Sequence, residues 1–253
     1  MIKLICGDSL DVMGYYDSKS FDLIFVDPPY NIGADKDLKR PEGGSYSGTA
    51  KDDWDKFSTF EKYDDFTLQW MTEVKRLLKD TGSVFICGTY HNIYRIGYHL
   101  QNLDFWILNE IIWLKTNPTP NFQGVRFCQG HESIIWASKK KKSKYKFNYQ
   151  ELKKINFDKQ MKAEWIISSP TGKRRIKVDG EKLHSSQKPK EILFRILTAC
   201  TDVDDMVLDP FLGSGTTAVM CKKMKRKCVG IDINQKYVDA SKVRVRNTKV
   251  WAF

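Results

Sequence analysis

Apolar residues occur in short continuous runs that alternate with longer segments of helical periodicity. The segment 63–78 is of the second kind, with Phe66, Trp70 and Val74 at helical spacing. Apolar runs that predict buried strands lie at residues 21–26, 83–87, 105–113 and 132–137, the last two joined by the loop 116–121. This alternation is typical of an α/β fold, with a mostly parallel sheet and helices on both of its faces.

Near the end of the chain the pattern predicts a strand, a glycine-rich turn, a helix and a second strand. The first strand is expected at 205–208, the turn at 209–217 and the second strand at 228–231, followed by Asp232. Glycines in such a turn let the backbone and a helix N-terminus approach a ligand, and an acid after the next strand is placed to bind ribose hydroxyls. The alternative is a tight turn that only packs the helix.

The chemistry of this turn narrows the choice of ligand. The sequence has no Gly-Lys-Ser/Thr phosphate loop, and Ala218 stands where the dinucleotide fingerprint has its third glycine, a position that also tolerates alanine. A nicotinamide enzyme therefore stays open. S-adenosylmethionine fits better, because it offers adenosine hydroxyls to Asp232 but has no pyrophosphate that requires a cradle.

The tetrapeptide Asp27-Pro28-Pro29-Tyr30 directly follows the first predicted strand. With each residue type near ~5% of a sequence, one specified tetrapeptide is expected by chance about 10⁻³ times in a chain of this length. Ligands of open α/β sheets bind beyond the carboxyl ends of the strands. At that position the Asp27 carboxylate and the Pro28 carbonyl are two acceptors for the N–H groups of an exocyclic amine. Tyr30 offers a flat face on which the ring that carries the amine could stack. A rigid strand-ending turn is the alternative, but it explains only the prolines.

Composition indicates one domain over 1–253 with a basic middle. The 253 residues are 41% hydrophobic and carry a net charge of +11, which favours a polyanionic partner such as nucleic acid. Residues 115–190 contain 19 Lys and Arg against 6 Asp and Glu, so the remainder is slightly acidic. The densest clusters are Lys139–Lys142 and Lys173–Arg175. A solvated loop is the alternative interpretation of each cluster.

Other features exclude several classes of protein. No apolar run is long enough to span a membrane, and the start of the chain has no signal-peptide pattern, so we expect a cytoplasmic protein. The six cysteines are scattered, which predicts reduced, mostly buried thiols and no metal site. Residues 33–58 contain several glycines among charged residues and predict a long mobile loop.

The motifs together resemble one family. Asp-Pro-Pro-Tyr at 27–30, followed much later by Asp-Pro-Phe-Leu-Gly-Ser-Gly-Thr-Thr at 209–217, is similar to the amino-methyltransferases that act on adenine N6 or cytosine N4 in DNA. Their order resembles the circularly permuted β class of that family. His-Ser-Ser-Gln-Lys-Pro at 184–189 and Gly-Asp at 7–8 match further motifs. The segments 92–98, 101–106 and 115–122 look closer still to the HinfI and CcrM branch, which methylates adenine in GANTC. Members of that branch carry a C-terminal domain, which we expect to be missing here because the sequence stops at Phe253.

The resemblance implies a Rossmann-like, S-adenosylmethionine-dependent methyltransferase fold with an inserted target-recognition segment at 115–183. Catalysis is expected from Asp27, Pro28, Pro29 and Tyr30. The expected contacts to S-adenosylmethionine are Asp8, Asp27, Ser186, Lys188, Asp209, Phe211, Gly213, Ser214, Gly215, Thr216 and Asp232. The expected contacts to DNA, together with the loop 33–58, are Lys115, Asn117, Arg126, Lys139, Lys140, Lys141, Lys142, Lys173, Arg174 and Arg175. No metal is expected.

The expected reaction is direct transfer of a methyl group to N6 of an adenine flipped out of duplex DNA. Adenine is preferred because the family's adenine enzymes usually begin the tetrapeptide with Asp and its cytosine enzymes with Ser. Cytosine N4 is the nearest alternative, and an amine in RNA is another. Arg126 is expected either to contact a guanine or to pair with Glu132. A homodimer, a companion restriction endonuclease and association with the nucleoid through DNA are further expectations from relatives.

Overall fold

An eight-stranded sheet forms the centre of the computed structural model, which describes residues 1–32, 38–39, 45–46, 55–178, 180–184 and 186–251. The strands lie in the order β1-β12-β11-β2-β5-β7-β6-β8. Their bounds are β1 (Ile2–Cys6), β2 (Phe21–Val26), β5 (Leu78–Gly88), β6 (Trp106–Leu114), β7 (His131–Ser138), β8 (Glu164–Ile166), β11 (Met206–Asp209) and β12 (Lys227–Asp232). Only β7 is antiparallel to its neighbours, so the predicted mostly parallel sheet is confirmed.

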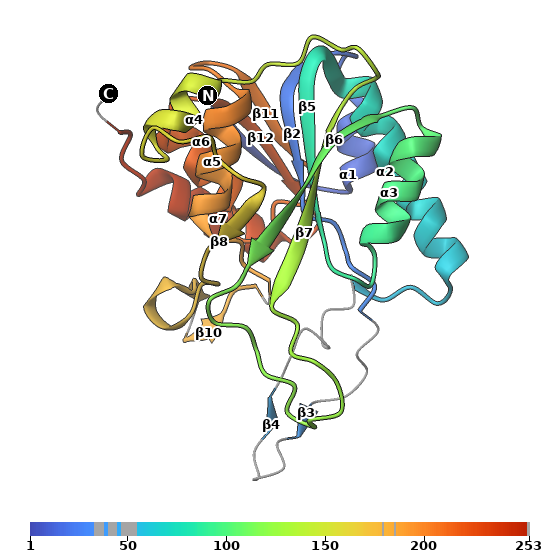
Figure 1. The fold of residues 1–253 in the computed structure, drawn as a ribbon, viewed down its shortest axis with the longest axis vertical. Helices are drawn as coiled ribbons and strands as arrows, with labels where there is room; N and C mark the ends of the chain where they lie inside the picture. Colours follow the sequence, from blue (N-terminus) through green and yellow to red (C-terminus); the bar gives the residue numbers. More distant parts are fainter. Residues whose placement is uncertain (33–37, 40–44, 47–54, 179, 185, 252–253) are drawn as a thin grey trace.

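Helices cover both faces of this sheet (Figure 1). One face carries α1 (Ser9–Gly14), α2 (Phe60–Leu77) and α3 (Ile93–Asn102). The other carries α4 (Tyr149–Lys154), α5 (Lys190–Cys200), α6 (Thr216–Lys223) and α7 (Gln235–Arg246). Two short antiparallel pairs, β3 (Leu38–Lys39) with β4 (Ser45–Tyr46) and β9 (Lys177–Val178) with β10 (Glu181–Lys182), lie outside the sheet.

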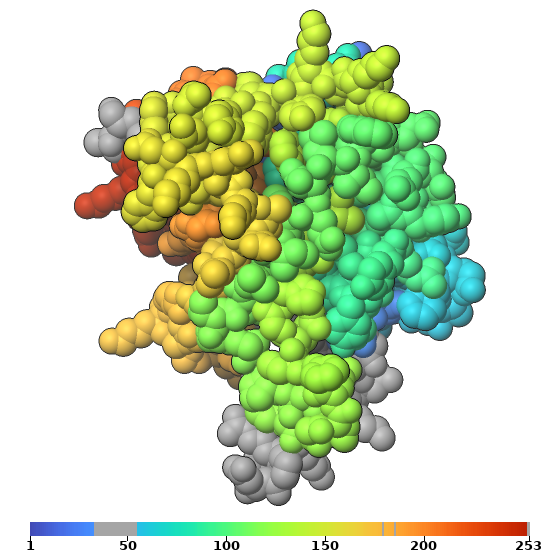
Figure 2. All heavy atoms as spheres, viewed as in Figure 1, coloured from blue at the N-terminus to red at the C-terminus, as the bar shows by residue number. Residues whose placement is uncertain are grey.

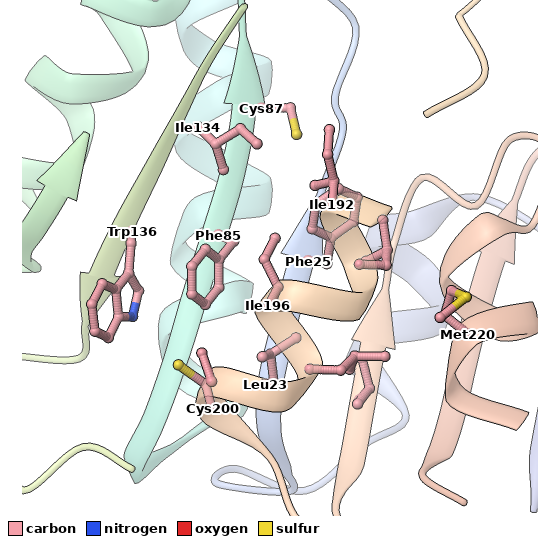
Figure 3. Packing of buried hydrophobic residues seen from close by; sticks show 14 of the residues in the cluster. Leu23, Phe25, Phe85, Cys87, Ile134, Trp136, Ile192, Ile196, Cys200 and Met220 are labelled. Carbon is pink, nitrogen blue, oxygen red and sulfur yellow. The ribbon is translucent and has the colours of Figure 1, made fainter. Parts of the chain in front are cut away.

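The alternation of side chains along β2 explains why both faces are covered. Leu23 and Phe25 are buried in the core that includes Ile192 and Ile196 of α5, as Figure 3 shows. Ile24 and Val26 alternate with them, point to the opposite face and pack in the core that contains Trp70 of α2. The continuous apolar run at 23–26 is typical of a strand in a sheet that is buried on both sides.

Most predicted elements exist, with shifted ends. The strand expected at 83–87 is longer and begins at Leu78, so α2 ends at Leu77 instead of 78. The strand β1 was not predicted, because no residue of this edge strand is fully buried and its apolar run is short. No helix in the described part of the chain is both long and apolar enough to cross a bilayer.

The topology brings the two motif turns together. Strand β2 pairs with β11, so the turn at 27–30 and the turn at 209–215 leave neighbouring strands at the same, carboxyl edge of the sheet. The predicted mobile loop 33–58 falls largely outside the described residues, which omit 33–37, 40–44 and 47–54.

Candidate active site

A cavity of about 1240 Å³ opens at the carboxyl edge of the parallel strands. It is lined by both motif turns and by residues that follow β1, β5 and β12. The predicted residues that line it are Asp8, Asp27, Pro28, Pro29, Tyr30, Lys115, Asn117, Arg175, Ser186, Lys188, Asp209, Phe211, Gly213, Ser214, Thr216 and Asp232. The fold therefore gathers the expected catalytic residues and most of the expected cofactor residues around one space.

The tetrapeptide turn is held in place by the side chains of two residues that follow it in the sequence. The carboxylate of Asp55 accepts the backbone N–H groups of Tyr30 at 2.5 Å and Asn31 at 2.7 Å, and that of Ile32 at 3.3 Å. The hydroxyl of Tyr63, on α2, donates to the carbonyl oxygen of Pro29 at 3.0 Å. Buried N–H groups need such acceptors, so Asp55 sets the path of the chain as it leaves the turn.

Both carboxylate oxygens of Asp27 have protein partners. The Tyr30 hydroxyl donates to Oδ1 at 2.7 Å, and Nζ of Lys188 lies 2.7 Å from Oδ2. Tyr30 itself is buried, and Nζ of Lys188 lies 5.2 Å from the centroid of its ring. The ammonium group of Lys188 therefore lies over one face of the Tyr30 ring, which the sequence analysis predicted to stack on the target base.

A second buried acid completes this charged group. The Glu132 side chain is only 9% exposed; its Oε2 lies 3.5 Å from Nζ of Lys188, and its Oε1 lies 2.6 Å from Nζ of Lys115. Burial raises the pKa of Asp27, and Lys188 only partly offsets this. For Glu132, burial opposes ionisation, but Lys188 and Lys115 together outweigh it and lower the pKa. Burial likewise disfavours the charged form of Lys188, but Asp27 and Glu132 raise its pKa overall.

The glycine-rich turn is held by Asp232. Oδ2 of Asp232 accepts the N–H of Gly213 at 2.7 Å, and Oδ1 accepts the N–H of Asn234 at 2.9 Å. Gly215 has φ +75°, and a Cβ there would lie 2.4 Å from the hydroxyl oxygen of Ser241. Gly215 is therefore required for the turn and for packing on α7, and the structure does not place it among the residues that line the cavity.

Two more predicted cofactor residues make local contacts. Asp8 caps α1, because its Oδ1 accepts the N–H of Leu10 at 2.8 Å. Asp209 is buried at the end of β11, and burial raises the pKa of its carboxyl to about 7. Both carboxyl groups line the cavity, so they are placed to meet a ligand as well.

Two residues expected to contact DNA are engaged within the protein, and a third, Arg126, is exposed with one contact at the surface. Lys115 points toward Glu132, as described above, and not to the surface. Asn117 bonds the backbone of Ser169 through both atoms of its amide, at 2.8 and 3.2 Å. Arg126 donates to the hydroxyl of Tyr90 at 3.2 Å, so the expected alternative pairing of Arg126 with Glu132 is wrong.

The two lysine and arginine clusters lie at opposite ends of the molecule. Nζ of Lys139 donates to the carbonyl of Leu78, at the start of β5, which places 139–142 at the amino edge of the parallel strands. Figure 2 shows this segment at the end opposite to the segments 115–130 and 170–182. Lys173 and Arg174 are exposed, and Arg175 lines the cavity. The structure thus brings only the cluster 173–175 to the cavity.

Two residues with clear roles in this geometry were missed by the sequence analysis. Asp55 lay inside a segment interpreted only as a loop, and Glu132 was considered only as a partner of Arg126. The signal for Glu132 was a carboxylate at the start of an otherwise apolar strand, because such a group requires partners when it is buried. Among the described residues no group of three or more His, Cys, Asp or Glu side chains could hold a metal ion.

Comparison with known proteins identifies the family of the chain. A family model described as DNA methylase, of the N6 and N4 type, matches residues 21–243. The chain is 47% identical over 247 residues to the type II methyltransferase M.HinfI of Haemophilus influenzae, covering 97% of this chain and 68% of that protein. It is 40% identical to the type II methyltransferase M2.LlaDCHI of Lactococcus lactis subsp. cremoris, covering 96% and 88%.

The fold of this chain resembles the crystal structure of an M1.HpyAVI–SAM complex, with a TM-score of 0.70. The two proteins are 25% identical, and the match covers 97% of this chain and 99% of the other. The family model covers most of the chain and includes both motif turns. The chain belongs to the N6/N4 DNA methylase family.

Proposed function

We propose that this chain transfers a methyl group from S-adenosylmethionine to N6 of an adenine flipped out of duplex DNA, within GANTC. The observation that carries the proposal is the position of Asp27, whose carboxylate lines the same cavity as the glycine-rich turn. An acceptor for an amine and a site for a methyl donor thereby lie within one enclosed space. GANTC is supported by the resemblance to the HinfI and CcrM branch and by the 47% identity to M.HinfI.

The residues of the cavity suit S-adenosylmethionine. Asp232 is the last residue of β12 and Asp8 lies two residues after β1. Their carboxylates retain lone pairs for ribose hydroxyls or an adenine amine. Phe211 and Ile233 also line the cavity and offer apolar contact to a flat ring. When bound, the cofactor supplies an electrophilic methyl group on a sulfonium sulfur.

Asp27 would orient the amine. Each of its carboxylate oxygens accepts one bond from the protein and keeps a further lone pair, so an N–H of the base is accommodated without breaking the contacts to Tyr30 or Lys188. An aromatic amine is a poor nucleophile because its lone pair is delocalised into the ring. Hydrogen bonds from both of its protons, to Asp27 and to the Pro28 carbonyl, favour a pyramidal nitrogen that is aligned for attack.

DNA would approach the carboxyl edge of the sheet. Arg126, Lys173 and Arg174 are exposed on the segments at this edge (Figure 2), and they would supply contacts to phosphates or bases. We leave 139–142 out of this surface because of its position at the amino edge. A companion endonuclease, a homodimer and a location in the nucleoid remain predictions.

Analysis of the methylated product tests the proposal. The purified protein is incubated with methyl-labelled S-adenosylmethionine and duplex DNA or RNA, and the digested nucleosides are separated. We expect labelled N6-methyl-2′-deoxyadenosine from the DNA and no labelled nucleoside from the RNA. Labelled N4-methylcytosine would instead support the alternative substrate within the same family, and label in RNA alone would contradict a DNA substrate.

A further inference from the structure

Four charged side chains form a closed group behind the catalytic turn, and they come from four places in the chain. Asp27 follows β2, Glu132 is the second residue of β7, Lys115 follows β6 and Lys188 precedes α5. The side chains of Lys188 and Glu132 are 4% and 9% exposed. Lys188 lies between the two acids, 2.7 Å from Asp27 and 3.5 Å from Glu132. Buried charges at this spacing interact strongly because water does not screen them.

The ammonium of Lys188 alone would weaken Asp27 as an acceptor. It holds Oδ2 at ion-pair distance and draws its electron density away from any other donor. Glu132 supplies the opposite charge on the other side of the same ammonium. We infer that Glu132 is a positioning residue for methyl transfer: through Lys188, it holds the Asp27 carboxylate in place and preserves its strength as the acceptor for the target amine.

This inference rests on the proposed function, and its chemistry follows from that reaction. The amine lone pair forms a bond to the methyl carbon as the carbon–sulfur bond breaks, and the electron pair of that bond stays on sulfur. The nitrogen then carries a positive charge until it releases one of its protons. Asp27 is the group that accepts the N–H carrying this proton, so a more basic carboxylate stabilises the charge that develops.

Every element packed around Asp27 contributes a titratable or charged group. Tyr30 lies on the same turn, Lys188 precedes α5, and Glu132 and Lys115 lie on β7 and after β6. Cys87 of β5 and Asp209 of β11 are the remaining neighbours whose negative charge would act on Asp27. Burial raises the pKa of both groups and so disfavours their charged forms. Glu132 is therefore the anion that balances Lys188, and Lys188 together with Lys115 lowers the pKa of Glu132 and favours its ionised form.

The test compares three single variants with the wild type. Glu132→Gln keeps the shape of the side chain and removes its charge, whereas Glu132→Asp keeps the charge. Glu110→Gln is the matched control: it neutralises an exposed acid on the neighbouring strand β6 that bonds Ser133 and does not line the cavity. The single-turnover rate constant of methyl transfer is measured against pH at saturating cofactor and DNA.

We expect Glu132→Gln to lower the maximal rate at least tenfold and to move the acidic limb of the profile to lower pH, because loss of the negative charge lowers the pKa of Asp27. Glu132→Asp should restore the position of that limb, and Glu110→Gln should match the wild type. A Glu132→Gln profile with an unmoved limb, or a rate within twofold of the wild type, would overturn the inference. If Glu132→Gln does not fold, the double variant Glu132→Gln with Lys115→Met tests the same shift with both partners neutral.

A second measurement does not depend on the substrate. The carboxyl carbon of Asp27 is titrated by NMR in protein carrying ¹³C-labelled aspartate, with Asp27→Asn used for assignment. The pKa of Asp27 should be lower in Glu132→Gln than in the wild type, and an equal or higher value would contradict the inference. If the wild type is inactive on DNA while the pKa of Asp27 is still lower in Glu132→Gln, the proposed function is refuted but the electrostatic effect of Glu132 on Asp27 stands.

Discussion

The Asp55 carboxylate accepts the backbone N–H of Tyr30 at 2.5 Å, which ties the end of a long connecting segment to the turn that carries Asp27. Two further N–H groups, of Asn31 and Ile32, bond the same carboxylate. Asn31 has a positive φ of 53°, a left-handed conformation that is uncommon outside glycine, although Asn adopts it more readily than most residues. Asp55 thus stabilises a turn that the backbone alone would not favour.

Replacement of Asp55 should impair catalysis without touching the substrate. Asp55→Ala leaves three N–H groups without their acceptor, at a cost of about 2 kcal/mol or more in folding stability. We expect turnover to fall at least tenfold while the Kd for S-adenosylmethionine changes less than threefold. Thermal unfolding, steady-state kinetics and calorimetry measure these three quantities. Asp65→Ala, an exposed position on α2, serves as the control, and an equal effect there would rule out a specific role.

Removal of Asp27 should abolish methyl transfer while the protein still binds its cofactor. Asp27→Ala deletes the acceptor of the amine and also leaves Lys188 with Glu132 as its remaining acid. We expect the rate to fall at least 100-fold, within the range for loss of a positioned acid or base. Equilibrium binding of S-adenosylmethionine should stay within about threefold. More than a tenth of the wild-type rate would show that Asp27 is not the acceptor.

Burial of Asp209 predicts a pH dependence of stability. Its pKa is about 7 in the fold against 3.8 for the free side chain, so the folded state holds a proton that the unfolded state releases between these values. The contribution of this group is complete below pH 3.8 and is lost as the pH rises through 7. Urea unfolding at pH 5 and pH 8 should therefore show a larger loss of stability in the wild type than in Asp209→Asn. Equal losses in both proteins would contradict this.

Charge reversal at the two ends of the molecule should separate their roles in DNA binding. Lys173→Glu with Arg174→Glu removes two cations at the carboxyl edge, and Lys140→Glu with Lys141→Glu removes two at the amino edge. The first pair should weaken DNA binding at least tenfold and reduce the salt dependence by about one unit per lost phosphate contact. The second should change affinity less than twofold. Equal losses would show that the sequence-based expectation for 139–142 was right.

Local patterns were sufficient to predict the two strand-and-turn units. The runs at 21–26 and 205–208 are followed directly by the motifs at 27–30 and 209–217, and each unit depends on neighbours in the sequence. Because β2 and β11 are neighbours in the sheet, the two turns lie side by side and form one site. That step followed from the fold class, because parallel strands share a carboxyl edge.

The roles of Glu132 and Asp55 and the position of the cluster 139–142 were not predicted. They depend on strand direction and tertiary contacts, which the sequence pattern does not contain. Glu132 and Lys139 are seven positions apart, but β7 runs between them from the carboxyl edge to the amino edge of the parallel strands, a rise of about 24 Å over seven residues. One residue therefore reaches Asp27 and the other lies at the opposite edge. Asp55 likewise has its role only because α2 and the turn are packed together.

One measurement tests the central claim most directly. The protein is incubated with methyl-labelled S-adenosylmethionine and two duplexes of equal length and composition, of which only one contains GANTC. We predict N6-methyladenine in the first duplex alone, with no labelled cytosine. Equal methylation of both duplexes would contradict GANTC recognition, and the absence of N6-methyladenine from both would contradict adenine methylation at this site.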